Sequence, residues 1–392
     1  MVLRHPFFVP TRVIEGKEFD QALRELLGGR RWSLITSPGW RTHGTVARVN
    51  SVCGEPVHVF TEVTENPTVS TITRVAGYLT DVEVVVALGG GSVIDAVKGA
   101  VALVALNGNM DLFLDHLREG LALPESLAPE PIIAIPTTSG TGSEVTRWGT
   151  IWGEDGIKHS VMHNNLAPRH AIIDPALTVS MSRDLTIATA LDALSHSMES
   201  VWNKRHSALT DAIATQAIRL LRENLNTVLL APNNIVLRRR IQTAALLAGL
   251  AMGTTQTALA HSISYPFTSR YGVPHGLACS FTLPEVAQFN MKTKPSRLAP
   301  IADGLACTSA EVPKVLEAWF ESLDLATMLF SYVSPEAIDE LGDNEVTRAR
   351  AANNIREIDG SAARDLARRA LYRLFETTKK KTNRQPLELA SF

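Results

Sequence analysis

The stretch Val82–Val104, VEVVVALGGGSVIDAVKGAVALV, decides the fold of this chain. It begins with a run of apolar and β-branched residues, which is typical of a strand buried on both faces of a sheet. Three glycines and Ser92 follow this run directly, and the residues after them have the spacing of a helix. A buried strand, a glycine turn and a helix in this order predict one unit of an open, mostly parallel sheet.

Apolar, β-branched runs of the same kind recur along the first half of the chain. Segments with helical spacing separate the early runs, and this alternation predicts a sheet with helices on both faces. From about Arg183 onward the pattern changes to segments of helical spacing with few strand-like runs. The expected strands are Trp32–Thr36, Val57–Phe60, Val82–Leu88, Pro131–Ile135 and Ala171–Asp174, and the expected helices include Phe19–Leu27, Thr68–Leu79, Val93–Leu103, Leu185–Trp202, Ala208–Leu221, Val236–Gly249 and Ala362–Phe375.

This change of pattern divides the chain into two expected domains. A single hydrophobic core stops growing at about 250–300 residues, and the chain has 392. We therefore expect an α/β N-terminal domain with a mostly parallel sheet over residues 1–179 and an all-helical C-terminal domain over residues 180–392.

The composition excludes several classes of protein. With 45% hydrophobic and 20% charged residues the chain has a globular composition, not a disordered one. Its 38 basic and 40 acidic residues do not indicate a nucleic acid or an anionic membrane as partner. No apolar run is long enough for a signal peptide or a membrane span. Cys53, Cys279 and Cys307 form no CxxC pair, which predicts a cytoplasmic location without disulfides or a thiolate metal cluster.

Two polar, glycine-rich segments follow buried strands. Glycines let a backbone approach a phosphate closely, and a helix N-terminus presents free N–H groups to it, so Gly90, Gly91 and Ser92 suit a phosphate. The GGGS spacing departs from the usual GxGxxG, and alone it is equally compatible with a tight turn that binds nothing. The second segment, PTTSGTGSE, follows the strand expected at Pro131–Ile135. Loops after parallel strands meet at one sheet edge, so together the segments predict an anionic ligand, most simply a dinucleotide.

One carboxylate and three imidazoles in the second half suit a divalent first-row metal. Asp192 and His196 are four residues apart in a segment of helical spacing, which places them on one face of a helix. His261 follows another helical run, and His275 lies in the sequence GVPHG. Each residue alone is compatible with an ordinary hydrogen-bonded core position.

Taken together and in their order along the chain, these motifs resemble the iron-containing (group III) alcohol dehydrogenases. The resemblance covers about residues 5–290, and it implies a dinucleotide-binding sheet domain and a metal-binding helical domain. The matching segments are GGGSVIDAVK (Gly89–Lys98), PTTSGTGSEVT (Pro136–Thr146), AIIDP (Ala171–Pro175), DALSHSMES (Asp192–Ser200) and the stretch from His261 to the PHG of Pro274–Gly276.

The resemblance also implies roles for individual residues. The implied reaction is reversible hydride transfer between a nicotinamide and an alcohol or aldehyde, with Fe(II), or alternatively Zn(II), polarising the carbonyl oxygen. The positions that match the metal ligands are Asp192, His196, His261 and His275. Those that match the cofactor site are Gly91 and Ser92 at the pyrophosphate, Thr137, Thr138 and Thr141 in the hydroxyl-rich loop, and Lys158 near the ribose.

The chain departs from the family pattern at the nucleotide ribose. Members that select NAD commonly have an acidic residue after the second strand, whereas Ser37 occupies that position here. Without the carboxylate there is no repulsion of a 2′-phosphate, and the nearby Arg41 and His43 could pair with one. We therefore expect NADP(H) to be preferred over NAD(H).

Further departures concern the proton relay and the substrate. Tyr265 stands where many members have a histidine, and a phenol is a poorer proton shuttle at neutral pH. The alternative routes for the proton are water, the ribose hydroxyls and Tyr265, and the alternative role of Tyr265 is packing. Arg147 and Arg270 are expected near the substrate and would match an anionic head group, unless they form surface ion pairs. Thr254, Gln256 and Thr257 add polar groups before His261.

These features indicate a metal-dependent NAD(P)H alcohol dehydrogenase that acts as an aldehyde reductase. The chain resembles the phosphonoacetaldehyde reductase branch, so the expected reaction is phosphonoacetaldehyde to 2-hydroxyethylphosphonate. Alternatives are a reductase of neutral or carboxylated small aldehydes, a lyase like dehydroquinate synthase, and a non-catalytic cofactor-binding protein. Dehydroquinate synthase is a sugar-phosphate cyclase, and such cyclases typically have one Glu and two His at the metal. The Asp with three His in this chain therefore favours the reductase. A homodimer is expected because it is common in the family.

Overall fold

The computed structural model describes residues 7–154, 156–346 and 350–388. The chain forms two compact units. One unit, here called the sheet unit, comprises Phe8–Met181 together with Asn233–Gln242. The other, the helical unit, comprises mainly Ser182–Pro232 and the chain from Thr243 onward.

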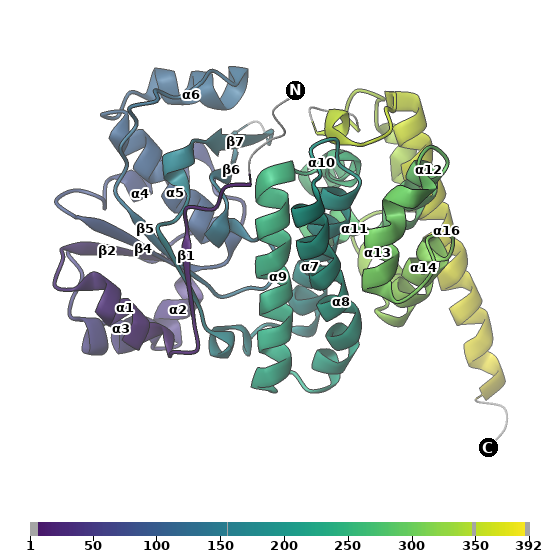
Figure 1. Cartoon of the computed structure of the whole chain (residues 1–392), viewed down its shortest axis with the longest axis horizontal. Helices are drawn as coiled ribbons and strands as arrows, with labels where there is room; N and C mark the ends of the chain where they lie inside the picture. The colour runs from purple at the N-terminus through teal and green to yellow at the C-terminus, as the bar shows by residue number, and fades with distance from the viewer. Residues whose placement is uncertain (1–6, 155, 347–349, 389–392) are drawn as a thin grey trace. The chain divides into compact units, whose positions relative to one another are not determined.

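A parallel sheet forms the centre of the sheet unit (Figure 1). Among the described residues it has six strands in the order β1-β8-β5-β4-β2-β3, and every pairing is parallel. A separate antiparallel hairpin is formed by β6 and β7. The strands are β1 Arg12–Glu15, β2 Trp32–Thr36, β3 His58–Phe60, β4 Val84–Gly89, β5 Ile132–Pro136, β6 Trp148–Trp152, β7 Lys158–Met162 and β8 His170–Ile173.

Successive residues of β4 contribute to two hydrophobic cores, one on each face of the sheet. Val84 and Val86 pack in a core that includes Phe19 of α1, whereas Val85 packs in a core that includes Ile72 of α4. Figure 1 shows α1 and α3 on one side of the strands and α4 and α5 on the other. The helical segments of this unit are α1 Phe19–Leu27, α2 Pro38–Thr42, α3 Thr45–Cys53, α4 Val69–Ala76, α5 Gly91–Ala105 and α6 Met110–Glu119, with short 3-10 turns η1 Ser143–Val145, η2 Asn164–Leu166 and η3 Pro175–Thr178.

The helical unit is built around α7, which is buried along most of its length. Its bounds and those of the other helices are α7 Arg183–Val201, α8 Ala208–Leu230, α9 Ile235–Thr255, α10 Leu259–Tyr271, α11 His275–Ser280, α12 Leu283–Met291, α13 Ala299–Leu305, α14 Val312–Ser322, α15 Leu325–Phe330 and α16 Gly360–Glu388, with η4 Pro295–Leu298, η5 Pro335–Glu340 and η6 Ala351–Asn353.

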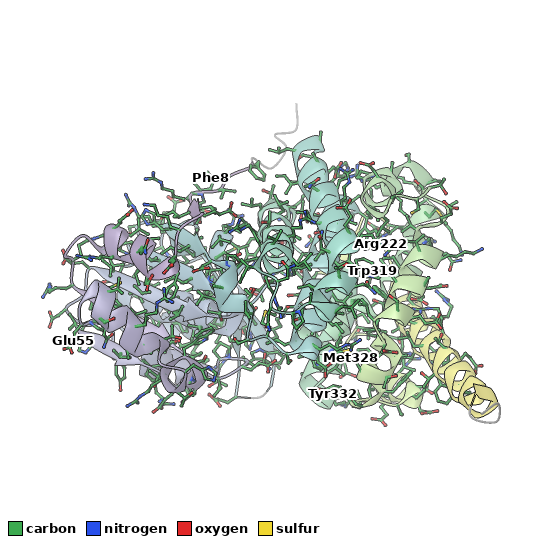
Figure 2. All side chains as sticks on the ribbon, turned by 90° about the horizontal axis from the view of Figure 1, so that it is seen from below. Phe8, Glu55, Arg222, Trp319, Met328 and Tyr332 are labelled. Carbon is green, nitrogen blue, oxygen red and sulfur yellow. The ribbon has the colours of Figure 1, made fainter. Side chains whose placement is uncertain are left out.

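Two contacts illustrate how these helices pack. Any Cβ at Gly276 of α11 would overlap the carbonyl oxygen of Ala188, so glycine lets α11 approach the α7 backbone closely. In the second contact, the guanidinium of Arg222 in α8 lies 5.4 Å from the ring centre of Trp319 in α14, a pair labelled in Figure 2. The close approach at Gly276 brings His275 beside α7.

The predicted fold class is confirmed: a mostly parallel sheet with helices on both faces, followed by a helical part. Helix Phe19–Leu27 and strand Trp32–Thr36 have the predicted bounds. The prediction omitted β1, which is four residues long, and the hairpin of β6 and β7, whose residues are only partly apolar. Within the described residues, no helix is long and apolar enough to cross a bilayer.

The structure differs from the expected division of the chain at the start of α9. Residues 233–242 group with the sheet unit, although the sequence pattern placed them in the helical domain. Arg238 is buried and donates to the carbonyl oxygen of Met181 at 3.3 Å, and Gln242 donates to that of Pro136 at 3.5 Å. These polar contacts, which helical spacing does not reveal, attach the segment to the sheet unit.

Candidate functional site

Asp192 lies at the centre of three imidazoles in the helical unit. It shares α7 with His196, one helical turn away, while His261 comes from α10 and His275 is the first residue of α11. The Nε2 atoms of His196, His261 and His275 lie 3.5, 3.6 and 3.9 Å from Oδ1 of Asp192. The rings of His196 and His261 are stacked, with their centres 4.8 Å apart. One carboxylate oxygen therefore faces three ring nitrogens.

This cluster contains polar atoms whose hydrogen-bonding capacity is unused. Among the described residues, neither Oδ1 of Asp192 nor Nε2 of His261 has a hydrogen-bond partner, although both atoms are buried. Burial alone would raise the pKa of the Asp192 carboxyl, but the positive charges of His196, His275 and His261 hold it well below its usual range. An ionised carboxylate and imidazoles of this arrangement suit a divalent cation, so these residues fit the metal that the resemblance implied.

Glu199 supports the cluster from one turn further along α7, and it was not among the predicted site residues. Its fully buried carboxylate accepts a hydrogen bond from Nδ1 of His261 at 2.7 Å. It also accepts from the backbone N–H groups of Ala258 and Ala260 at 2.7 and 2.6 Å. A proton on Nδ1 leaves Nε2 of His261 with a lone pair directed at the cluster. The available signal was an acidic residue three positions after His196 in an apolar helix.

Cys279 is a second residue at the cluster that was not among the predicted site residues. Its Sγ lies 3.5 Å from both ring nitrogens of His275, one turn earlier on α11. Donor atoms of Asp192, His261, His275 and Cys279 all lie within 4.8 Å of one another. Cysteine spacing gave no signal because the sulfur reaches the cluster alone, without a CxxC partner.

The sheet unit brings together the two polar, glycine-rich loops. Gly89 at the end of β4 is in register with Pro136 at the end of β5, and its carbonyl accepts from Thr137 N at 3.0 Å. A Cβ on Gly91 would lie 2.6 Å from Cγ2 of Thr141. A Cβ on Gly90 would lie 3.2 Å from Thr138. The two loops therefore lie in direct contact at one edge of the sheet.

The sheet has a switch point at β2, where the side on which the next strand is added changes although all strands stay parallel. The strand after β2 is added on one side of it, and the next strand, β4, on the other. In open parallel sheets, ligands bind at such a point, beyond the carboxyl ends of the strands. Ser37 directly follows β2, Gly90 directly follows β4, and Arg41 and His43 are exposed in and just after α2. Ser92 Oγ accepts a hydrogen bond from Asn66 N at 3.3 Å.

Lys98 is fully buried in α5, the helix that begins in the first of the two loops. Its Nζ donates to the carbonyl oxygens of Ser143 and Trp148 at 2.6 and 2.7 Å and to the hydroxyls of Ser143 and Thr146 at 2.9 and 3.3 Å. Burial lowers the pKa of Lys98 to about 8, although the charge of Asp95 opposes this shift. The contacts fix the segment that follows the hydroxyl-rich loop.

Two acidic residues share this buried environment. Asp95 accepts hydrogen bonds from Ser143 Oγ and from Thr150 N, the latter at 2.9 Å. Burial raises the pKa of Glu144 to about 7, and it also raises the pKa of Asp95. Lys158, on β7, is close enough to stabilise the negative charge of Asp95. The resemblance singled out Lys158 but neither Lys98 nor the two acids.

The residues expected at the substrate are divided between the units. In the sheet unit, Arg147 donates to Asn164 Oδ1 at 2.8 Å, and its Nε is buried without a hydrogen-bond partner among the described residues. In the helical unit, Arg270 is exposed and donates to the carbonyl oxygen of Glu340 at 3.0 Å. Tyr265 is half-buried, one turn after His261 on α10.

Gln256, expected among the polar residues of the substrate pocket, is engaged within the helical unit. Its Oε1 accepts from Arg350 at 2.9 Å, and its backbone has a φ of 67°. The carbonyl of the adjacent Thr257 accepts from Asn353 at 2.8 Å. These contacts attach the turn before α10 to the segment around η6.

Comparison with known proteins gives matches to both halves of the chain. A model described as iron-containing alcohol dehydrogenase matches residues 10–175, and one described as the C-terminal part of the Fe-containing alcohol dehydrogenase family matches residues 186–371. The chain is 30% identical to long-chain-alcohol dehydrogenase 1 of Geobacillus thermodenitrificans, over 88% of this chain and 90% of that protein.

Two further similar proteins are named as sulfoacetaldehyde reductases. That of Bilophila wadsworthia is 32% identical over 69% of this chain and 72% of its own length. The crystal structure of the Bifidobacterium kashiwanohense protein in complex with NAD+ has a TM-score of 0.82 and 27% identity, covering 93% of this chain and 98% of that one.

Proposed function

Because this chain belongs to the iron-containing alcohol dehydrogenase family, we propose that it is a metal-dependent aldehyde reductase that uses NAD(P)H. The observation that carries the proposal is the cluster around Asp192. A buried, ionised carboxylate oxygen faces three imidazole nitrogens, and neither that oxygen nor Nε2 of His261 has another hydrogen-bond partner among the described residues. Such a cluster is costly without a cation and favourable with one.

In this proposal Asp192, His196, His261 and His275 hold the metal, which when bound polarises the substrate carbonyl. Glu199 keeps the Nδ1 proton of His261 in place, so that Nε2 remains available as a ligand. A bound nicotinamide would supply the hydride that reduces the carbonyl carbon. Tyr265 Oη supplies the proton to the product oxygen, directly or through water, and regains it from solvent.

In the sheet unit we assign the cofactor to the edge formed by the ends of β2, β4 and β5. Gly90, Gly91 and Ser92 receive the pyrophosphate at the start of α5. The hydroxyls of the facing loop and Lys158 contact the remainder of the cofactor. The hydroxyl-bearing residues in this assignment are Thr137, Thr138 and Thr141.

We propose a preference for NADP(H) because Ser37, and not an acid, follows β2, with Arg41 exposed nearby. The NAD+ complex of a relative shows that NAD+ binds to this fold, so the preference depends on this chain's own residues. Steady-state rates with NADPH and NADH test it. Ser37→Asp should reverse the preference by repelling the 2′-phosphate, and a wild-type preference for NADH would contradict the proposal.

For the substrate we propose a small anionic aldehyde, with phosphonoacetaldehyde reduced to 2-hydroxyethylphosphonate as the specific reaction. The support is that two relatives are named for an aldehyde with an anionic sulfonate, and that Arg147 and Arg270 provide guanidinium groups. A neutral small aldehyde is the second candidate. It is favoured by the contacts that already engage the two arginines with Asn164 and the carbonyl of Glu340.

A matched panel of aldehydes decides between these substrates. Phosphonoacetaldehyde, sulfoacetaldehyde and a neutral aldehyde of similar size would be assayed with both nicotinamides and with Fe(II) or Zn(II). We expect the highest kcat/KM for an anionic aldehyde, and we expect Arg147→Ala or Arg270→Ala to raise its KM far more than that of the neutral one. Equal effects on both aldehydes would remove the anionic-substrate proposal.

The same assay addresses the lyase alternative. The family membership and the carboxylate with three imidazoles favour hydride transfer over cyclase chemistry. One NADPH should be oxidised for each alcohol formed, whereas turnover without loss of NADPH would support a lyase. We also propose a homodimer, which light scattering tests, and a cytoplasmic location.

A further inference from the structure

The sulfur of Cys279 lies close to the donor atoms of the cluster around Asp192. Cys279 is fully buried in α11, one helical turn after His275. Its Sγ lies 3.5 Å from the ring nitrogens of His275, and it belongs with Asp192, His261 and His275 to a group of donor atoms within 4.8 Å of one another. The sulfur therefore lies at the distances that separate ligands of one metal ion.

The other two cysteines differ from Cys279 in their surroundings. Cys53 and Cys307 are only partly buried. Cys53 contacts the backbone carbonyl of Asp20 at 3.4 Å in the sheet unit, and Cys307 lies just after α13. Neither belongs to a group of potential metal ligands among the described residues. These two residues serve as internal controls for any effect assigned to the sulfur of Cys279.

The charges and chemical type of the donors also suit a thiolate. Asp192 contributes one negative charge, and Glu199 is engaged by His261 and by backbone N–H groups. A thiolate would add the second negative charge that balances a divalent cation in a buried site. Thiolate sulfur is a soft donor that favours Zn(II), whereas carboxylate and imidazole discriminate less between Zn(II) and Fe(II).

We propose that Cys279 is a ligand of the metal centre, and that its thiolate makes this centre favour Zn(II) over Fe(II). Binding forms one sulfur–metal bond, and the thiol proton passes to solvent. The inference rests on the metal-dependent function proposed above. It goes beyond that function because it adds a donor to the four residues that the sequence assigned.

Spectroscopy of the full-length protein tests the sulfur without relying on activity. The chain would be freed of metal and loaded anaerobically with Co(II) or Zn(II). We expect the Co(II) protein to show a near-ultraviolet thiolate-to-metal charge-transfer band, which Cys279→Ser loses and which Cys53→Ser and Cys307→Ser retain. Zinc X-ray absorption of the wild-type chain should show one sulfur at about 2.3 Å. This second measurement does not depend on the folding of a variant.

Binding competition measures the proposed selectivity. Loss of a residue that only supports a metal ligand weakens metal binding roughly ten- to hundred-fold. Loss of a ligand should cost at least as much, so Cys279→Ser should weaken Zn(II) binding by at least this factor, while Fe(II) binding changes less. Bound metal without a sulfur neighbour, or a charge-transfer band that persists in Cys279→Ser, would overturn the role of Cys279 alone. A wild-type chain that binds neither ion would overturn the metal-dependent function as well.

Discussion

Each of the two units buries a cluster of polar side chains. The clusters differ in whether other groups of the protein provide all of their hydrogen-bond partners. In the sheet unit, Lys98 has four oxygen partners between 2.6 and 3.3 Å. In the helical unit, Oδ1 of Asp192 and Nε2 of His261 have no hydrogen-bond partner among the described residues. Buried polar atoms are normally hydrogen-bonded, so an unsatisfied cluster needs a ligand to explain it.

This difference distinguishes a cluster that the protein itself satisfies from one for which we propose a metal ion. Lys98 positions the loop segment that contains Ser143, and its role is complete within the protein. For the atoms around Asp192 we instead propose a site whose stability depends on an added cation. Variants in the two clusters should therefore respond differently to added metal.

The largest effect is expected from Asp192→Asn. The amide keeps the shape but removes the negative charge that faces the imidazoles, so activity should fall about 10⁴-fold, or about 5 kcal/mol. Added Zn(II) should raise the melting temperature of the metal-free wild type but not that of the variant. Asp184→Asn changes an exposed residue in the first turn of the same helix and is the control. Equal responses of the two variants to Zn(II) would contradict the comparison.

Lys98→Met should destabilise the sheet unit whether or not metal is present. It leaves Asp95 without its buried countercharge and the carbonyls of Ser143 and Trp148 without their donor, at a cost of about 3–5 kcal/mol. Chemical denaturation measures this loss, and the KM for the nicotinamide should rise with it. Lys292→Met, at an exposed position, should remain near the wild type. A loss of stability that Zn(II) reverses would show that the clusters are not independent.

Glu144→Gln should change how stability depends on pH. The folded protein raises the pKa of Glu144 from 4.5 to about 7, so its carboxyl contributes full stability below pH 4.5. That contribution is lost as the pH rises to about 7. At pH 8 the variant should therefore gain stability over the wild type, on the order of 3 kcal/mol more than at pH 4.5. Denaturation at both pH values checks this, with the exposed Glu119→Gln as control; a gain independent of pH would refute it.

Glu199→Gln should have the smallest of these effects, confined to metal binding. The variant has a weaker acceptor for the Nδ1 proton of His261, so metal affinity should fall about 10- to 100-fold. Competition with a chelator measures the affinity, and excess metal should restore most of the activity. The exposed Glu223→Gln, on α8, serves as control. An unchanged affinity would mean that Glu199 only stabilises the start of α10.

The spacing of apolar residues was sufficient to predict the helices and strands in which burial follows a regular period. Helix Phe19–Leu27 and strand Trp32–Thr36 are found as predicted because burial of their side chains follows a simple period. The β6–β7 hairpin was missed because its burial is irregular, as in Lys158–Met162, where one residue of five is fully buried. A period-based prediction has no signal in such a segment.

The candidate metal centre shows the same limit at the level of side chains. Asp192 and His196 could be predicted as a pair because they lie four residues apart on one helix. Grouping His261 and His275 with them required the resemblance to a family. Glu199 and Cys279 were missed because only the packing of α10 and α11 on α7 brings them to the other donors. The position of Glu199, three residues after His196, was a local signal, but it does not show that the carboxylate contacts His261 of another helix.

The contacts of residues 233–242 have a consequence for dissecting the protein. A fragment that ends at Met181 would contain every described strand of the sheet but would lack Arg238 and Gln242. The carbonyl oxygens of Met181 and Pro136 would then lose the donors that they have in the full chain. A synthetic peptide of residues 233–242 should therefore bind to such a fragment and increase its stability. The part of the gene that encodes the complete sheet unit is thus discontinuous.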